Sequence, residues 1–200
     1  MWSGRSAATT AIVAGLILSG CSFTVWPSST ENTASPHERI TCRTDALPNF
    51  ECWGISLRAP AGWKPVPPAG GEGDTHPVFR ENIGVDSFNA LDIAAFRLLR
   101  SVDDPTSVEQ IGRDFEQLFH QLIESQGGDV LSFERSDIDG NPAWRAEGTL
   151  TASGHRMEGT VLFVVNGNQQ YSIACLYEIS RRQRSRDLCE QALRSTSVST

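Results

Sequence analysis

The stretch that decides the fold is Val130–Tyr177, with the sequence VLSFERSDIDGNPAWRAEGTLTASGHRMEGTVLFVVNGNQQYSIACLY. Its alternating or continuous apolar runs predict four strands, at residues 130–138, 143–152, 157–165 and 170–177. Two of the connections are Asp139-Gly140-Asn141 and Asn166-Gly167-Asn168, and Gly and Asn accept the positive φ that tight hairpin turns need. The stretch therefore predicts an antiparallel meander.

A helix is predicted on each side of this meander. In the first helix, Thr106 or Ser107 can act as the N-cap, apolar residues recur at helical spacing over residues 108–123, and Gly127-Gly128 ends the helix. The second helix is predicted over residues 181–196, with an apolar stripe that includes Cys189.

Further strands are predicted upstream, at residues 53–58, 77–83 and 90–100, with a Pro- and Gly-rich loop over 65–74. Strands and helices that are grouped rather than strictly alternating are typical of an α+β fold. The predicted architecture is an antiparallel meander sheet with helices packed on it.

Several segments resemble the PsbP-like α/β/α fold, which occurs in bacterial extracytoplasmic lipoproteins of the LpqN type. They are Gly54–Trp63 (GISLRAPAGW), the helix in the middle of the chain, Gly140–Ala143 (GNPA), and the final hairpin with its C-terminal helix. The resemblance covers roughly residues 52–197. It implies an α/β/α sandwich and an accessory or binding protein without a catalytic centre.

The N-terminus carries an export signal. Arg5 precedes an apolar run over residues 11–18, which is too short for a comfortable membrane span, and the run ends in Leu18-Ser19-Gly20-Cys21. This ending resembles the lipobox of bacterial lipoproteins, which implies that residues 1–20 are a signal peptide and that Cys21 is lipidated. The alternative is a signal peptide with an incidental cysteine. The expected location is the extracytoplasmic face of the cell membrane, with the lipid on Cys21 as the anchor.

The rest of the chain is predicted to form a spacer and one domain. Residues 21–49 are rich in Ser, Thr, Pro and Asn without regular periodicity, which is typical of a flexible spacer. The remaining residues, 50–200, are about the length of one ordinary domain. The net charge of −7 argues against a nucleic-acid partner, because phosphate binding needs a surplus of cations.

The chain has five cysteines, of which four remain when Cys21 is set aside. An even number in an exported chain favours disulfides over free thiols. Four cysteines allow three connectivities, and local pairing gives Cys42–Cys52 and Cys175–Cys189. Metal ligation is the alternative, but the chain has no Cys-x-x-Cys.

No common catalytic or nucleotide-binding motif is present, and no cofactor or metal is predicted. The four histidines, at positions 37, 76, 120 and 155, form no pair with metal-ligand spacing on one element. His120 could pair with Glu116 or Glu124 as an acid–base couple, but the solvated polar face of an amphipathic helix is a far more frequent reason for such residues. A calcium loop at Asp137, Asp139 and Asn141 is disfavoured relative to a hairpin turn, because the later acidic ligand of an EF-hand is missing.

Two groups of residues are candidates for binding a partner. The basic cluster Arg181, Arg182, Arg184 and Arg186 could meet lipid headgroups or an acidic protein, or could simply be the solvated first turn of the last helix. Six aromatic residues could line an apolar cleft or could be ordinary core: Trp53, Trp63, Phe79, Phe88, Phe96 and Trp144.

These observations favour a non-catalytic binding or accessory domain at the cell envelope, not an enzyme. Its expected partners are the membrane, through the lipid anchor, and a protein or small apolar ligand. The alternative is an envelope hydrolase with an unrecognised active site, in which His120 or His155 would lie with a carboxylate and a Ser, Thr or metal in one pocket.

Overall fold

Two antiparallel β-sheets and two α-helices make up the structure, so the predicted α+β class is confirmed. The computed structural model describes residues 40–67, 77–98, 101–152 and 154–199. Within these ranges the elements are β1 (Asn49–Cys52), β2 (Ile55–Arg58), β3 (Lys64–Pro65), β4 (Phe79–Asp86), β5 (Asn89–Arg97), α1 (Pro105–Ser125), β6 (Val130–Ile138), β7 (Asn141–Ala152), β8 (His155–Asn166), β9 (Gln169–Glu178), the 3₁₀ turn η1 (Ile179–Arg181), α2 (Arg182–Arg194) and β10 (Ser197–Val198).

The large sheet is built around the predicted meander. Its strand order is β3-β4-β5-β9-β8-β7-β6, and strands β6 to β9 follow one another as hairpins. The turn between β6 and β7 holds Asp139 and Gly140 at φ values of 53° and 82°, which is the left-handed conformation expected there. Beyond β9 the sheet continues with β5, although α1 and three strands separate β5 from β9 in the chain.

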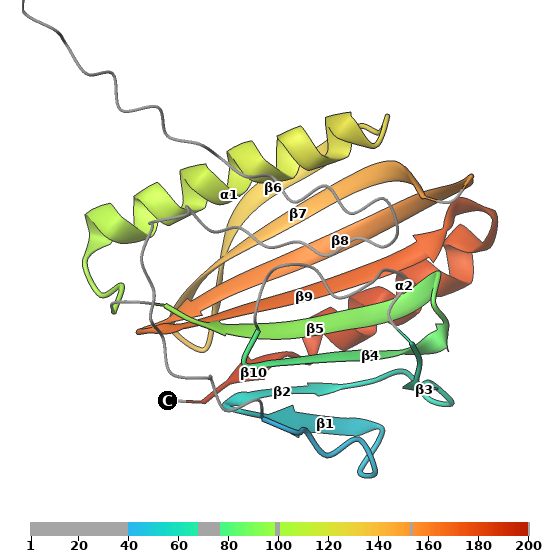
Figure 1. Ribbon diagram of the computed structural model, residues 1–200, viewed down its shortest axis with the longest axis horizontal. Helices are drawn as coiled ribbons and strands as arrows, with labels where there is room; N and C mark the ends of the chain where they lie inside the picture. The colour runs from blue at the N-terminus through green and yellow to red at the C-terminus, as the bar shows by residue number, and fades with distance from the viewer. Residues whose placement is uncertain (1–39, 68–76, 99–100, 153, 200) are drawn as a thin grey trace, which may run out of the picture.

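Helix α1 crosses one face of the large sheet over β6 and β7 (Figure 1). Its buried side chains include Phe115, Phe119 and Ile123, and they form a hydrophobic cluster with sheet residues such as Trp144 and Phe163. The rings of Phe115 and Phe163 stack with 4.6 Å between their centroids. The helical periodicity of the apolar residues therefore determines which face of α1 meets the sheet.

The predicted N-cap of α1 is wrong. The N-cap is Asp104, whose side-chain carboxylate accepts a hydrogen bond of 2.9 Å from the backbone N–H of Ser107. Pro105 occupies the first helical position, where its missing N–H removes nothing from the helix and its fixed φ suits the first turn. The helix therefore starts before Thr106 and Ser107, which lie inside its first turn.

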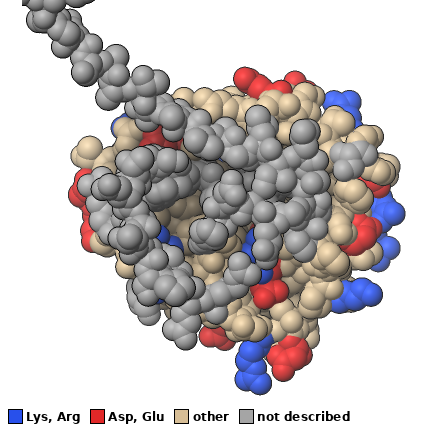
Figure 2. Space-filling view, in the orientation of Figure 1, with Lys and Arg blue, Asp and Glu red and all other residues tan. Residues whose placement is uncertain are grey.

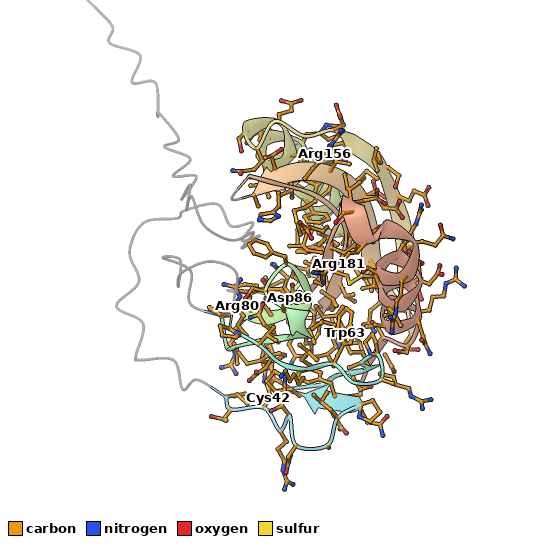
Figure 3. The ribbon with its side chains drawn as sticks, turned by 90° about the vertical axis from the view of Figure 1, so that its right-hand side faces the viewer. Cys42, Trp63, Arg80, Asp86, Arg156 and Arg181 are labelled. Carbon is orange, nitrogen blue, oxygen red and sulfur yellow. A yellow bond between two sulfur atoms is a disulfide. The ribbon has the colours of Figure 1, made fainter. Side chains whose placement is uncertain are left out.

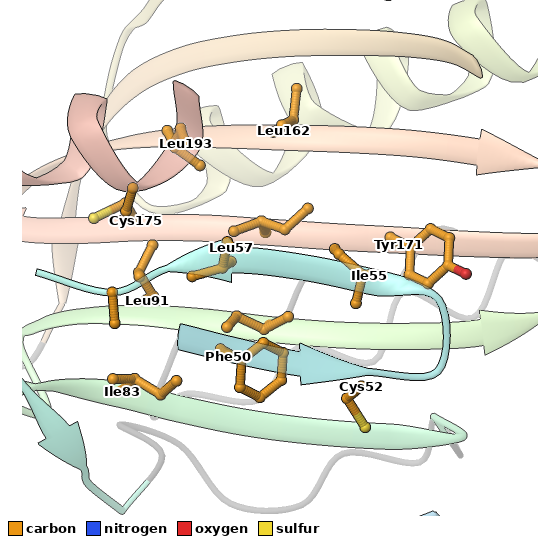
Figure 4. Packing of buried hydrophobic residues seen from close by; sticks show 14 of the residues in the cluster. Phe50, Cys52, Ile55, Leu57, Ile83, Leu91, Leu162, Tyr171, Cys175 and Leu193 are labelled. Carbon is orange, nitrogen blue, oxygen red and sulfur yellow. The ribbon is translucent and has the colours of Figure 1, made fainter. Parts of the chain in front are cut away.

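The opposite face of the large sheet is covered by α2 and by the small sheet, whose order is β1-β2-β10. Figure 4 shows Phe50, Ile55 and Leu57 of the small sheet within this second cluster. They share it with Ile83 of β4 and Leu91 of β5. The domain thus has three layers, with the large sheet in the middle.

Two disulfides fasten the second layer, with the connectivity that local pairing predicts. Cys42 is bonded to Cys52 at the end of β1, with a Cα–Cα distance of 5.4 Å. Cys175 of β9 is bonded to Cys189 of α2, with a Cα–Cα distance of 5.8 Å. The second bond attaches α2 directly to the middle of the large sheet.

Residues 40–49 were predicted to belong to the flexible spacer, but they pack against the domain. The backbone N–H of Ile40 donates a hydrogen bond of 2.9 Å to the carbonyl of Val78. Cys42 is buried and disulfide-bonded, and β1 begins at Asn49. One disulfide and a few backbone hydrogen bonds hold this segment in place. Such contacts need no regular spacing of apolar residues, so the sequence gives no periodic signal for them.

Three short strands were not predicted as such. β1, β3 and β10 contain only four, two and two residues. A run that short has no readable periodicity, and its strand conformation comes from pairing with β2 or β4. The last helix is likewise shorter than predicted, because Arg181 belongs to the 3₁₀ turn and the helix ends at Arg194.

The C-terminal strand β10 is held by the turn between β6 and β7. The Asp139 carboxylate accepts hydrogen bonds of 2.7 Å from the Ser197 hydroxyl and 2.9 Å from the Val198 N–H, and these bonds lower its pKa. A carboxylate with a lowered pKa stabilises the fold above its unfolded pKa of about 4 and loses that effect as pH falls through its folded pKa.

Asp139→Gly should therefore detach β10 from this turn while leaving its pairing with β2 and the turn itself intact, because glycine accepts the positive φ at this position. Amide hydrogen exchange at Val198 should become at least about tenfold faster in the variant, and wild type should show the same loss of protection as pH falls through the lowered pKa of Asp139. Unchanged protection at Val198 in the variant would contradict this role of Asp139.

Candidate functional site

Helix α1 covers only part of its face of the large sheet. It packs on β6 and β7, whereas α2 and the small sheet lie on the opposite face. Figure 1 shows β9, β5 and β4 continuing away from α1 on the side that faces the viewer. Among the described residues, no helix or strand packs over this half of the face.

The strand register identifies the side chains on this uncovered half. Leu91, Ile93 and Ala95 of β5 point into the cluster under α2, so the alternate residues of β5 point to the α1 side. Cross-strand pairing adds their neighbours on β4 and β9. We name this surface the open sheet face, and its polar and aromatic members are Arg80, Asn82, Asp92, Phe96, Gln170 and Ser172.

An ion pair lies at the β4 side of the open sheet face. The Arg80 guanidinium donates to the Asp92 carboxylate through Nε at 2.9 Å and through Nη2 at 2.5 Å. The two side chains are only 20% and 14% exposed (Figure 3 labels Arg80). Burial raises the pKa of Asp92, and the hydrogen bonds and positive charge of Arg80 only partly oppose this. Each of the two charges would be unfavourable at this buried position without the other.

The floor of the face contains two buried polar side chains that make no hydrogen bond to any described residue. Gln170 and Ser172 on β9 are 4% and 6% exposed. Within the described ranges, neither side chain makes a hydrogen bond, although buried polar groups in proteins are nearly always paired. Because they are not sealed completely from solvent, these groups are free to bind something other than the protein itself.

An aromatic ring lies beside Gln170. Phe96 of β5 is directly opposite Gln170 in the register and is half-buried. Of the six aromatic residues considered for an apolar cleft, Trp63, Phe79 and Trp144 are core, and Trp53 and Phe88 pack against the core. Phe96 belongs to neither cluster of the described residues, so core packing does not account for it.

The charged side chains among the described members of the open sheet face, Arg80 and Asp92, are of opposite sign. Figure 2 views the molecule from the α1 side, and the Lys, Arg, Asp and Glu side chains that are visible along its rim are of both signs. Together, the Arg80 and Asp92 side chains carry no net charge. A surface of this kind does not favour a strongly charged polymer.

A second polar cluster lies at one end of the sheet. His155 Nδ1 is 2.5 Å from Glu178 Oε1, and its ring is 4.9 Å from that of Phe88. Arg181 pairs with Asp86 at 3.2 Å, as Figure 3 illustrates. Partial burial opposes ionisation of Asp86, but hydrogen bonds from Asn89 and Phe88 and the charge of Arg181 together lower its pKa.

The order of groups in this cluster differs from that of a hydrolytic triad. The Ser180 hydroxyl donates to Glu178 Oε2 at 3.3 Å, and Glu178 then contacts His155. A serine nucleophile must be hydrogen-bonded to the histidine, with the carboxylate behind the histidine. Here the carboxylate lies between the two, so the cluster is not arranged to activate Ser180.

The basic cluster predicted to bind a partner is divided by the fold. Arg181 pairs with Asp86, and Arg186 lies 3.7 Å from Glu147. Arg184 is exposed on α2 and has no ion pair with a described residue. The side chain of Arg182 lies outside the described residues. The four arginines therefore do not act as one uncompensated surface.

The remaining predicted site residues are placed as follows. Cys21, the signal peptide, His37 and His76 lie outside the described residues. His120 is exposed on the outer side of α1. Asp137 accepts a hydrogen bond from the Gly140 N–H at 2.8 Å, as a turn residue does. No group of three or more metal-ligating side chains is found within the described ranges.

Sequence reasoning missed the polar residues of the open sheet face. The signal was present, since Gln170 and Ser172 alternate with Tyr171 and Ile173 in an otherwise apolar strand, and Asp92 interrupts Leu91 and Ile93. In a strand with helices expected on both sides, such alternation indicates that one face is not fully covered by the core.

No protein-family model matches the chain, and no curated protein sequence is significantly similar to it. Several solved structures are similar in fold, and two of them are LpqN and CyanoP. LpqN, involved in cell envelope biogenesis of Mycobacterium tuberculosis, is 13% identical with a TM-score of 0.50, over 80% of this chain and 90% of LpqN. Cyanobacterial PsbP (CyanoP) from Synechocystis sp. PCC 6803 is 14% identical with a TM-score of 0.49, over 86% of this chain and 98% of CyanoP. The chain therefore has the α+β fold of LpqN. In the present chain, α1 packs on only part of the large sheet.

Proposed function

We propose that this protein is a lipid-anchored component of the extracytoplasmic membrane face, and that its domain is a non-catalytic binding module. The observation that carries the proposal is the open sheet face, where Gln170 and Ser172 are buried without a partner among the described residues. Their polar atoms are not fully sealed from solvent, so a ligand that lies on this face can complete their hydrogen bonds.

The location is supported by the cysteines and by the N-terminal sequence. Stable disulfides form in oxidising compartments, and both pairs of the domain are bonded. Residues 1–21 have the charge, apolar run and terminal cysteine of a lipoprotein signal. Neither of the described helices is long and apolar enough to cross a membrane.

The similarity in fold to LpqN supports a role at the cell envelope. LpqN is involved in cell envelope biogenesis, and the present chain shares its fold at low identity. We infer a role of the same broad kind, in which an anchored domain holds an envelope component for other proteins to use.

The anchor is tested by replacing Cys21 with alanine in the full chain and labelling cells with radioactive palmitate. We expect the wild-type protein to be labelled and to float with membranes, and the variant to be unlabelled and either soluble or unprocessed, because the thioether is the point of attachment. A labelled, membrane-bound Cys21→Ala protein would show that Cys21 is not the anchor.

The binding module is tested with the unlipidated Cys21→Ala chain and isolated cell envelopes. We expect it to sediment with the envelopes. Adding Gln170→Leu and Ser172→Leu should abolish sedimentation, because both changes remove the hydrogen-bonding groups of the floor. Gln117→Leu, an exposed change on α1, is the matched control. Equal sedimentation of all three proteins would contradict a binding role for this face.

A further inference from the structure

We propose that the open sheet face binds a neutral carbohydrate, in the form of a short oligosaccharide lying across β4, β5 and β9. This inference rests on the proposed function and specifies the chemistry of its ligand. Four features of the face carry it: its charge balance, its mixture of hydrogen-bonding groups, its aromatic ring and its dimensions.

The charge balance favours an uncharged ligand. Arg80 and Asp92 are oriented toward each other and joined by two hydrogen bonds, so neither charge is available for an ionic partner. An anionic ligand would have to compete with Asp92 for the guanidinium, and a cation would have to compete with Arg80 for the carboxylate. Either competition would leave a poorly solvated charge without its partner, which is strongly unfavourable.

The hydrogen-bonding groups are mixed donors and acceptors. The amides of Gln170 and Asn82 offer both, as does the Ser172 hydroxyl, and the guanidinium of Arg80 keeps N–H groups that do not face Asp92. An apolar ligand would bury these groups unpaired, which is unfavourable. A polyhydroxylated ligand satisfies them, because each hydroxyl both donates and accepts.

The aromatic ring gives such a ligand an apolar contact. A sugar ring has C–H groups on its faces and hydroxyls around its edge, and the face of an aromatic ring carries partial negative charge that attracts C–H groups. Phe96 lies directly opposite Gln170, so one sugar unit can stack on the ring while its hydroxyls reach the amide. The absence of Phe96 from both described core clusters fits this use.

The dimensions fit more than one sugar unit. The face spans three neighbouring strands, or about 10 Å across, and the positions from Asp92 to Phe96 extend about 13 Å along β5. Small residues lie between the polar ones, since Ala94 is paired with both Arg80 and Ser172. The floor is therefore low at its centre, with the longer side chains of Arg80 and Phe96 on either side.

The test uses the full chain with Cys21→Ala and a panel of neutral hexaoses of glucose, mannose, galactose and arabinose. Binding is measured by titration calorimetry and by NMR of the Gln170 side-chain amide. We expect at least one hexaose to bind and to shift that amide resonance. Gln170→Ala and Phe96→Ala should each weaken binding at least tenfold, and Gln117→Ala should leave it unchanged. Thermal unfolding establishes that each variant is folded.

Charged and non-carbohydrate probes complete the test. A galacturonic acid hexamer should bind at least tenfold more weakly than the preferred neutral hexaose. The inference is overturned if no hexaose binds, if binding is insensitive to both Gln170→Ala and Phe96→Ala, or if a fatty acid or a peptide occupies the face instead. If the hexaoses fail while envelope sedimentation still depends on Gln170 and Ser172, the ligand class is wrong and the binding module stands. If both fail, the proposed function falls as well.

Discussion

Replacing Phe115 with alanine should lower the free energy of unfolding by about 3–5 kcal/mol, the largest effect expected of any single change considered. Phe115 is 1% exposed and stacks on Phe163, and its ring centroid is 5.6 Å from that of Phe133 and 6.2 Å from that of Phe119. Alanine would remove one of the buried side chains through which α1 packs on the sheet and leave a cavity that rigid neighbours cannot fill.

The measurement is urea unfolding followed by tryptophan fluorescence, with thermal unfolding alongside. A loss of this size corresponds to a fall in Tm of about 6–20 °C for a domain of this length. Gln117→Ala, two positions along α1 and exposed, should change stability by less than about 0.5 kcal/mol. If Phe115→Ala does not fold, Phe115→Leu should retain the fold with a smaller loss. A change below about 1 kcal/mol in Phe115→Ala would contradict the packing of α1 described above.

Removing the second disulfide with Cys175→Ala and Cys189→Ala should cost about 3 kcal/mol, because the bond closes a loop with a sequence separation of 14. The open chain gains conformational freedom in the unfolded state, and α2 loses its covalent attachment to β9 in the folded state. Hydrogen exchange should therefore quicken across α2 before the rest of the domain.

The other disulfide supplies the control. Cys42→Ala with Cys52→Ala removes a bond of similar loop length, with a separation of 10, and should cost a similar amount of stability. Its faster exchange should be confined to the residues around β1. Unchanged protection of α2 in the Cys175→Ala/Cys189→Ala protein, with stability within about 1 kcal/mol of wild type, would show that packing alone holds the helix.

Much of this fold is encoded locally and was accessible from the sequence. The turns at Asp139-Gly140 and Asn166-Gly167 limit strands β6 to β9, because few residues other than glycine and asparagine accept the backbone conformation of tight hairpins. The buried face of α1 follows from helical periodicity. The disulfide connectivity follows from short separations, because a nearby cysteine is the most accessible partner.

The pairing of β5 with β9 was decided only by the tertiary structure. Antiparallel edges offer the same backbone groups to any partner, so neither strand specifies the other by its own sequence. That one pairing places Phe96 opposite Gln170 and Ala94 opposite Ser172, and it thereby creates the open sheet face. The extent of α1 over the sheet determines how much of that face remains uncovered.

Local sequence thus determined the two helices, the meander strands, their turns and the bonded cysteines, since each depends on backbone conformation or on residues close together in the chain. Tertiary structure decided which polar residues became neighbours. Arg80 and Asp92 come from adjacent strands of one hairpin, but Gln170 and Ser172 reach the same face only through a pairing that spans α1 and three further strands. The candidate site depends on that long-range pairing because hydrogen-bonding groups recognise a ligand by their relative positions, and no single segment contains those positions.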